Sequence, residues 1–531
     1  MPPTPPEPHQ LESSFLKSTT PKALVTVAVA MAVVYFLVLA FLFPRGNQVL
    51  FWLLMAGEIF HIWQIATYVY TVWDQPAGGA PYRPVSGGAP ALPADVFITV
   101  TGEPTEVVEA TARAALRMNY PAGFNVYLLN DGKIAKKPNW REAESLAKRL
   151  GIACITRQKP GGAKAGNINH ALRLTRNPLV VVFDADQMPR PDFLKKSAAY
   201  FSDPEVGFVQ SPQYYKNFNT NEITRGAWEQ QELFFGPICK GKNRLNSAFL
   251  CGTNMAIRRA ALEQAGGMFE KSIAEDFLTS LFLHERGWKS IYIPEILAEG
   301  LAPEDFLSYY KQQFRWARGS LEMVFRYNPL LRRGLTWHQK IQYLASASYY
   351  LSGLVVLLNA LLPLVFFFTG QVPLIVSTMG LTAIFLPYIF LVILTLRLTS
   401  NYSYTFRALS FSMASFPIHI QALWAVLTNQ NSGFSVTAKK KLDGNFLYLS
   451  APHLLYIAAA LLGMEWGYLR DGLTAPLLTN MSWALFNIMV FLPFVFASGP
   501  WAETARQQGE NQPGLKYAEP ASESVFKLKD G

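Results

Sequence analysis

Two aspartates follow a short apolar run in the segment PLVVVFDADQMPRPDF (178–193), where Asp184 and Asp186 are separated by one residue. The run is typical of a buried strand, and residues two apart leave a strand on the same side. Two carboxylates placed side by side favour a bound cation. Their oxygens suit Mg²⁺ or Mn²⁺, ions that commonly hold a diphosphate as a further ligand. A D-x-D triplet also occurs by chance, so its place at a strand end is what favours a metal and diphosphate site.

Two earlier segments repeat the pattern of an apolar run that ends in a polar turn: PADVFITVTGEP (93–104) and FNVYLLNDG (124–132). Loops at the carboxyl ends of parallel strands meet at one edge of a sheet. We therefore expect Glu103 and Asp131 to lie near Asp184 and Asp186. A simple turn through 130–132 explains the second segment equally well.

A glycine-rich turn enters a helical pattern in KPGGAKAGNINHAL (159–172), with Lys164 at the turn. Backbone N–H groups, a helix N-terminus and an ammonium group suit a diphosphate. The alternative is a loop with a solvated lysine.

Two adjacent carboxylates, Glu275 and Asp276, begin an amphipathic helix in SIAEDFLTSLFLHERGW (272–288). Carboxylates are stabilised at a helix N-terminus by the helix dipole, which is the purely structural explanation. The functional explanation is a general base that accepts a proton from an attacking hydroxyl.

A second helical segment, QQFRW (312–316), places Gln312, Arg315 and Trp316 on one face. The face combines an amide, a planar fork of donors and a flat apolar ring. It precedes a long apolar run, so an Arg-Trp pair that anchors a helix at the membrane surface is the alternative.

Hydropathy predicts how these motifs are distributed between membrane spans and a globular domain. Half of the 531 residues are hydrophobic, and six apolar windows are long enough to cross a bilayer. They cover residues 23–43, 49–73, 340–368, 372–397, 447–465 and 474–497. The sequence therefore predicts a multi-pass membrane protein in which an α/β domain, 95–335, is inserted after two spans (23–73) and a Pro/Gly linker (74–94). Two spans in 336–398 and two in 447–498 follow, and disordered ends are expected at 1–22 and 499–531.

The segment 402–429 is also long enough to span, but it contains Arg407, Pro417 and His419. We interpret it as an interfacial helix within the region 399–446. Clustered Lys and Arg at the span ends, including KKK at 439–441, predict that the α/β domain and both termini are cytoplasmic. The net charge of +10 then needs no nucleic-acid partner, because anionic lipids of the bilayer account for it.

The order of these motifs, D, D-x-D, E-D and Q-x-x-R-W flanked by spans, resembles the processive family-2 glycosyltransferases of the cellulose synthase type. The resemblance covers about residues 90 to 445 and includes two further segments. LCGTN (250–254) is similar to the family's acceptor-site segment, and GFSVTAKK (433–440) is similar to its FxVTxK gating loop. At the nucleotide-entry motif, VTGE (100–103) stands where the family usually has TYNE, so only Glu103 carries over.

The resemblance implies a GT-A-type α/β domain and a role for each motif. Donor and UDP binding falls to Glu103, Asp131, Lys164, Asp184, Asp186, Gln312, Arg315, Thr437 and Lys439, with Mg²⁺ or Mn²⁺ on Asp184 and Asp186. Catalysis falls to Asp276 as base, with Glu275 beside it and Arg315 on the leaving group. Acceptor binding falls to Trp316, Cys251, Gly252 and Thr253.

These features predict an inverting, processive synthase in the inner (plasma) membrane. It would polymerise UDP-glucose into a β-glucan and export the growing chain through its own channel, with a periplasmic accessory subunit as a possible partner. Cellulose is the first product expected, and a β-1,3- or mixed-linkage glucan comes next. A polymerase of UDP-GlcNAc, of the chitin or hyaluronan type, is one alternative. A non-catalytic transporter with a nucleotide-binding domain is the other.

Overall fold

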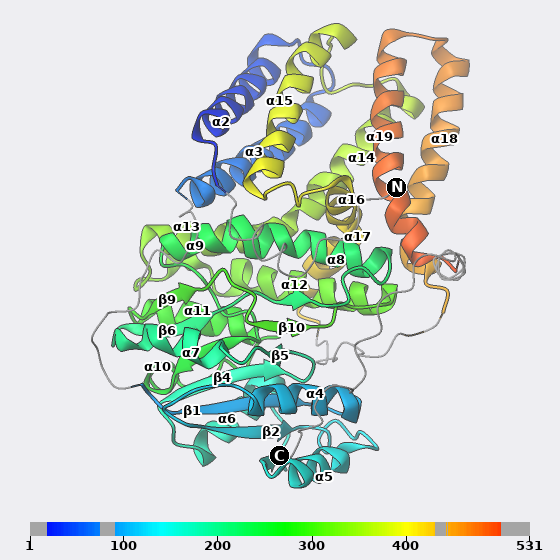
Figure 1. Cartoon of the computed structure of the whole chain (residues 1–531). Helices are drawn as coiled ribbons and strands as arrows, with labels where there is room; N and C mark the ends of the chain where they lie inside the picture. The colour runs from blue at the N-terminus through cyan, green and yellow to red at the C-terminus, as the bar shows by residue number, and fades with distance from the viewer. Residues whose placement is uncertain (1–18, 75–90, 431–441, 443, 501–531) are drawn as a thin grey trace, which may run out of the picture.

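A computed structural model describes residues 19–74, 91–430, 442 and 444–500 of the chain. The α/β domain and a bundle of long helices occupy opposite ends of the molecule (Figure 1). The two candidate gating residues, Thr437 and Lys439, lie outside the described residues, as do most of both termini and the linker.

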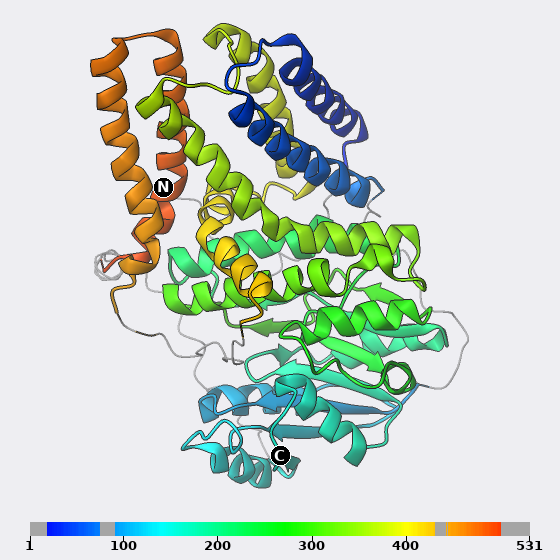
Figure 2. The ribbon, with the colours of Figure 1, turned by 180° about the vertical axis from the view of Figure 1, so that it is seen from behind.

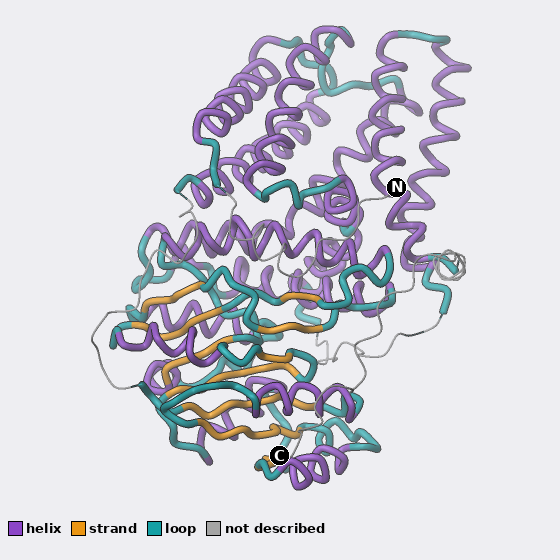
Figure 3. The backbone as a smooth tube through the Cα atoms, in the orientation of Figure 1, coloured by secondary structure: helices purple, strands orange, loops and turns teal. Residues whose placement is uncertain are grey.

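A seven-stranded mixed sheet forms the centre of the α/β domain (Figure 3), in the order β3-β2-β1-β4-β8-β6-β9. β8 is antiparallel to both neighbours and the other pairs are parallel. The strands are β1 (Ala94–Val100), β2 (Phe124–Asn130), β3 (Ala153–Thr156), β4 (Leu179–Asp184), β6 (Val206–Gln210), β8 (Met255–Arg258) and β9 (Lys289–Tyr292). The three apolar runs interpreted as strands from the sequence are thus β1, β2 and β4.

The register of these strands brings the motif residues to one edge. Thr99 on β1 pairs with Asp184 on β4, and Val100 pairs with Asn130 on β2. The strand order reverses direction between β1 and β4, which is where parallel sheets open a ligand crevice. The sequence's expectation that the strand ends converge is confirmed.

Alternate residues of β1 pack against different helices. Val96 and Ile98 belong to the core formed with α4 (Thr105–Leu116) and α5 (Trp140–Leu150). Phe97 belongs to the core on the other face, which includes α6 (Ala163–Leu174). Both faces of β1 are therefore buried, which explains why it reads as an almost continuous apolar run.

A layer of helices separates the sheet from the long apolar helices (Figures 1 and 2). It contains α8 (Glu222–Leu233), α12 (Phe306–Arg326), α13 (Trp337–Ser348) and α17 (Phe416–Leu427). A small second sheet of β5 (Met188–Pro189), β10 (Ala298–Gly300) and β7 (Tyr214–Tyr215) lies beside this layer. The Q-x-x-R-W motif is on α12 and so faces the sheet from the membrane side.

The chain is a multi-pass membrane protein. Seven helices of the described part are long and apolar enough to cross a bilayer, one more than the six predicted. The six predicted windows correspond to α2 (Lys22–Leu37), α3 (Gln48–Val72), α14 (Ser352–Thr369), α15 (Thr378–Thr399), α18 (Ala451–Asp471) and α19 (Ala475–Ser498). The predicted window 340–368 lies within one candidate span, Trp337–Thr369. In this span a 3₁₀ turn at Tyr349–Leu351 joins α13 to α14, and α13 belongs to the layer of helices between the sheet and the long apolar helices.

The seventh helix corresponds to the segment predicted as interfacial. It is interrupted at Ser415 into α16 (Phe406–Ala414) and α17, and 61% of its apolar window is buried inside the protein. Both halves lie at the level of α8 and α12 (Figure 1). The interfacial interpretation stays a prediction, because length and composition alone also permit a span.

Candidate active site

One cavity of about 460 Å³ opens at the carboxyl ends of β1 and β4 and continues to α3, α8 and α13. Its wall contains Glu103, Asp131, Lys164, Asp184, Asp186, Cys251, Gly252, Glu275, Asp276, Gln312, Arg315 and Trp316. The structure therefore brings together every site residue predicted in the described part except Thr253. A single chamber joins the strand ends to a membrane helix.

Lys164 and Asp184 form an ion pair at the sheet edge. The Lys164 ammonium also donates to the Gly252 carbonyl at 2.7 Å. Burial lowers the pKa of Lys164, but the carboxylates of Asp184 and Glu275 outweigh this effect and raise that pKa overall. Lys164 is therefore a fixed positive charge beside the D-x-D motif.

The acceptor-site segment is locked around this pair. Thr253 is fully buried, and its hydroxyl accepts a hydrogen bond from the Asp184 N–H at 2.9 Å. Gly252 has φ +83°, and a Cβ there would lie 3.1 Å from the Asp276 carboxylate. The Gln210 side chain accepts from the Cys251 N–H and donates to the Thr253 carbonyl, both at 2.8 Å. Thr253 thus positions the backbone of Asp184, and it does not line the cavity. Its contact with the acceptor stays a prediction.

Asp186 lies deeper than Asp184 and is 2% exposed. One of its oxygens accepts from the Leu301 N–H at 3.1 Å, while its side chain still lines the cavity. No group of three or more His, Cys, Asp or Glu side chains in the described ranges is arranged to hold a metal. A metal on Asp184 and Asp186 would have to take its other ligands from substrate and water, which is how Mg²⁺ usually binds beside phosphates.

Asp131 is held by an arginine that sequence reasoning missed. The Arg157 guanidinium donates to both Asp131 oxygens, at 2.9 and 2.6 Å, and to the Ala163 carbonyl at 3.1 Å. Both side chains are buried. The pair thus ties the end of β2 to the glycine-rich turn before α6. Arg157 follows β3 in an unremarkable segment, so only the parallel pairing of β2 with β3 identifies it.

Replacement of Arg157 by Ala should destabilise the α/β domain strongly. Removal of one partner leaves a buried carboxylate uncompensated, a change that typically costs about 3 to 5 kcal/mol. A fall in the apparent unfolding temperature of the detergent-solubilised protein measures it. Arg149→Ala is the matched control, because Arg149 pairs with Glu109 on the surface at 3.2 Å, and it should change that temperature little. Equal effects of the two variants would contradict the assignment.

Glu103 bends back onto its own turn at the entrance of the cavity. Its carboxylate accepts from the Thr101 N–H at 2.5 Å, and both residues line the wall. This contact fixes the turn after β1. The resemblance implies that Glu103 binds the sugar-nucleotide donor. The geometry permits this role, because the Glu103 side chain lines the same cavity as Asp131 and Asp184.

Glu275 and Asp276 start α11 (Glu275–Glu285) and both face the cavity. Asp276 accepts from the Phe277 N–H at 2.7 Å, and Glu275 is 8% exposed. Burial raises the pKa of both carboxyl groups, and the neighbouring Lys164 partly counteracts the rise. The backbone N–H on Asp276 favours its charged form. The pKa of Asp276 is raised less than that of Glu275, so Asp276 is the carboxyl group that more readily ionises and can accept a proton at neutral pH.

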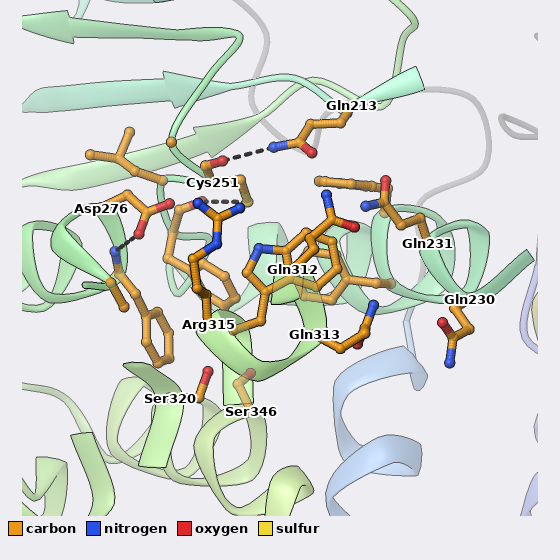
Figure 4. A pocket seen from close by; sticks show the side chains of 18 of the residues that line it. Gln213, Gln230, Gln231, Cys251, Asp276, Gln312, Gln313, Arg315, Ser320 and Ser346 are labelled. Carbon is orange, nitrogen blue, oxygen red and sulfur yellow. Dashed lines mark hydrogen bonds between the residues drawn. The ribbon is translucent and has the colours of Figure 1, made fainter. Parts of the chain in front are cut away.

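The predicted face of α12 lies opposite these carboxylates. Gln312, Arg315 and Trp316 line the cavity, and Figure 4 shows Arg315 and Gln312 on the helix side of the chamber with Asp276 and Cys251 across from Arg315. The charge of Arg315 interacts with the carboxylates of Asp184, Glu275 and Asp276. The positive charge of Arg315 therefore lies near both the D-x-D motif and the candidate base, so that one bound molecule could contact all three.

Amide side chains line the cavity in a number that motif analysis did not predict. They are Gln64, Gln187, Gln213, Gln230, Gln231, Gln312, Gln313 and Gln342, and several are labelled in Figure 4. Gln213 donates to the Cys251 carbonyl at 2.8 Å. Apart from Gln312 of the Q-x-x-R-W motif, no spacing pattern in the sequence reveals these residues, because the set comes from six separate segments.

Glu58 and His61 have a separate environment on α3. Glu58 accepts from the Tyr35 hydroxyl at 3.2 Å and lies 3.6 Å from His61. Tyr35 stacks on Tyr388 with ring centroids 4.5 Å apart. The cavity contacts α3 instead through Gln64, Thr67, Tyr68 and Thr71. Glu58 therefore joins α3 to α2 through its hydrogen bond with Tyr35.

Together, the α/β sheet, the carboxylates at its edge and the apolar helices fit the membrane-inserted glycosyltransferase that the motifs predicted. The chain matches the family model "Glycosyltransferase like family 2" over residues 92–319 and the model "Cellulose synthase" over residues 263–411. Each match covers less than half of the chain, and both agree with the resemblance to the cellulose synthase branch of glycosyltransferase family 2 that the motifs predicted.

The chain is also similar to individual known proteins. "Cellulose synthase 2" of Novacetimonas hansenii is 30% identical over 83% of this chain and 28% of its own length. "Cellulose synthase catalytic subunit [UDP-forming]" of Pseudomonas fluorescens (strain SBW25) is 30% identical over 75% of this chain and 55% of its own length. This chain thus spans between about a quarter and about half of these relatives. A mannosyltransferase of Pyrobaculum calidifontis, solved in complex with GDP-Man and Mn²⁺, is 17% identical over 72% of this chain, with a TM-score of 0.47.

Proposed function

We propose that the protein is a processive, inverting synthase that transfers glucose from UDP-glucose to the end of a β-glucan, with cellulose as the first expected product. The observation that carries the proposal is the single cavity that joins the D-x-D edge, the carboxylates of α11 and the membrane helix α3. A donor and a long acceptor can occupy the two ends of such a chamber at the same time. The names of the relatives favour UDP as the nucleotide and cellulose as the product.

In the proposed reaction, Asp276 accepts the proton of the acceptor's terminal hydroxyl as that oxygen attacks C1 of the donor glucose. The new C–O bond forms while the bond from C1 to the diphosphate oxygen breaks, and UDP leaves with the bonding electron pair. Arg315 and Lys164 are placed to stabilise the charge that develops on the diphosphate. Attack from the face opposite to UDP inverts the configuration at C1.

Asp184 and Asp186 would hold a Mg²⁺ or Mn²⁺ ion. The donor set fits, because both side chains present carboxylate oxygens at the cavity wall and a diphosphate supplies further oxygens. When bound, the ion adds positive charge at the leaving group. Glu103, Asp131 and Gln312 would contact the nucleotide, whereas Trp316, Cys251 and Gly252 would contact the acceptor sugar.

Export of the product by the same chain follows from where the cavity leads. Away from the strand ends, its wall includes residues of α3 and α13 and the tyrosines Tyr349 and Tyr350, so a chain that grows from Asp276 would be directed towards the bilayer. The Lys and Arg distribution orients the α/β domain to the cytoplasmic side of the inner membrane, where UDP-glucose is available. Release on the opposite side would hand the glucan to any periplasmic accessory subunit.

Synthesis by purified protein in lipid vesicles tests the proposal. We expect radiolabelled UDP-glucose with Mg²⁺ or Mn²⁺ to give a polymer that a β-1,4-specific glucanase degrades, and we expect EDTA to stop its formation. Excess Mg²⁺ added after EDTA should restore it. Digestion of the polymer by a β-1,3-glucanase would contradict the proposed β-1,4 linkage. Polymer formed from UDP-GlcNAc alone would contradict UDP-glucose as the donor. Nucleotide binding without polymer from either donor would favour the transporter.

A further inference from the structure

A buried charged group lies on α12 directly after the Q-x-x-R-W motif. Arg318, Glu322 and Arg326 are spaced four residues apart, so they form one stripe along the helix. Arg318 is 5% exposed and Glu322 is 4% exposed. Glu322 lies between the two arginines, 3.9 Å from Arg318 and 3.6 Å from Arg326. None of the three belongs to the motifs that predicted the active site.

On one side, Glu322 holds the segment that precedes the candidate base. It accepts a hydrogen bond from the Ser272 hydroxyl at 2.6 Å. The same hydroxyl accepts from the Ala274 N–H at 3.2 Å and so shapes the turn before Glu275. The helix also passes very close to this turn, because a Cβ on Gly319 would lie 2.4 Å from that of Ala274.

On the other side, the arginines hold the end of α17. Arg318 donates to the Gln430 carbonyl. Arg326 donates to the Asn429 side chain at 2.8 Å and to the Val426 carbonyl at 3.3 Å. Guanidinium groups at a helix C-terminus satisfy carbonyls that the helix itself leaves without partners. Glu322 therefore stands between two attachments, one to the start of α11 and one to α17.

The charges make Glu322 the centre of this arrangement. A guanidinium as buried as that of Arg318 is costly unless a carboxylate or several acceptors compensate for it. Without the charge of Glu322, the two arginines would repel each other across about two helical turns. Both attachments would then loosen together, although neither touches the substrate.

We propose that Glu322 is a positioning residue for glycosyl transfer, which fixes the 272–276 segment against α12 and the end of α17 and so sets the placement of Asp276. The inference rests on the proposed function and adds to it a residue that acts through Ser272. Small displacements of a catalytic group lower the rate far more than they lower ground-state binding.

Two variants separate the parts of this arrangement. Glu322→Gln removes the charge, while its amide oxygen can still accept from Ser272. Ser272→Ala removes the hydroxyl and keeps every charge. We expect each to lower kcat by about 10- to 100-fold, with the KM for UDP-glucose changed less than twofold, and Ser272→Thr to restore most of kcat. Glu285→Gln is the matched control, since Glu285 on α11 pairs with Arg332 at 3.5 Å on the side away from Ser272.

Hydrogen exchange of the substrate-free protein gives a readout that does not depend on synthesis. Glu322→Gln should speed exchange in both 272–276 and 426–430, whereas Glu285→Gln should change neither. This result would support the positioning role even if the wild type made no polymer, an outcome that would refute the proposed function alone. The positioning role would be overturned if exchange stayed unchanged, or if kcat of the folded Ser272→Ala variant equalled that of the control.

Discussion

Replacement of Asp276 by Asn should abolish measurable polymer synthesis while UDP binding persists. Asn is close to Asp in size and can keep the hydrogen bond from the Phe277 N–H, but it cannot accept a proton from the attacking hydroxyl. Loss of a positioned general base typically costs about 10² to 10⁴ in rate. The initial rate of glucose incorporation measures polymer synthesis, and titration with UDP measures nucleotide binding.

The control for this prediction is Glu106→Gln. Glu106 also lies in the first turn of a helix, α4, but it is exposed. If Asp276 served only to stabilise the helix N-terminus, both variants would keep most of their activity. A large loss confined to Asp276→Asn is the result that supports the base.

Stability and pH dependence give an independent check on Asp276. Burial raises the pKa of its carboxyl group, so the folded state binds the proton more tightly than the unfolded state. The charged form therefore opposes folding as pH rises from the unfolded value, about 3.9, through the folded value. Asp276→Asn removes this penalty, so its apparent unfolding temperature at neutral pH should not fall. Activity of the wild type should decline with acidification at a pH above the ordinary carboxyl range, because the base becomes protonated there.

Replacement of Arg315 by Ala should lower kcat by about 10² to 10³, the usual effect of losing one donor that stabilises developing charge. Arg315 interacts with the same carboxylates that surround the leaving group, and it lies across the cavity from them. Arg315→Lys should recover only part of the rate, since an ammonium cannot present the planar fork of donors. Single-turnover measurements with a labelled donor isolate this step from chain release.

Lys311→Ala is the control on the same helix, because Lys311 is exposed and is not among the residues that line the cavity. A merely interfacial anchor at position 315 predicts a different outcome. Membrane insertion and yield would then fall in Arg315→Ala, and kcat of the inserted protein would match that of Lys311→Ala.

Local pattern was sufficient for the parts of the site that end a strand or begin a helix. Asp184, Asp131 and Glu103 each follow an apolar run, and parallel pairing brings such ends together whatever the loops do. Glu275 and Arg315 were found because each has a short motif. The sequence therefore predicted the α/β class and most of the residues that the structure gathers around the cavity, whose donor and acceptor roles stay predictions.

The parts that were missed depend on contacts between distant segments. Arg157 reaches Asp131 only because β3 lies beside β2, and Gln210 reaches the acceptor segment only because β6 pairs with β8. The 3₁₀ turn between α13 and α14 leaves no mark in hydropathy, because the apolar residues continue through it. Thr437 and Lys439, outside the described residues, remain predictions.

The many amides around the cavity have a consequence for how a polymer could advance. A glutamine both donates and accepts, so it can serve any sugar hydroxyl in either sense. A chain that moves forward by one unit exchanges each hydrogen bond for a nearly equivalent one with the next amide. The polymer would then cross only small free-energy barriers as it moves. The free energy released by each glucosyl transfer from UDP-glucose would suffice to move it forward.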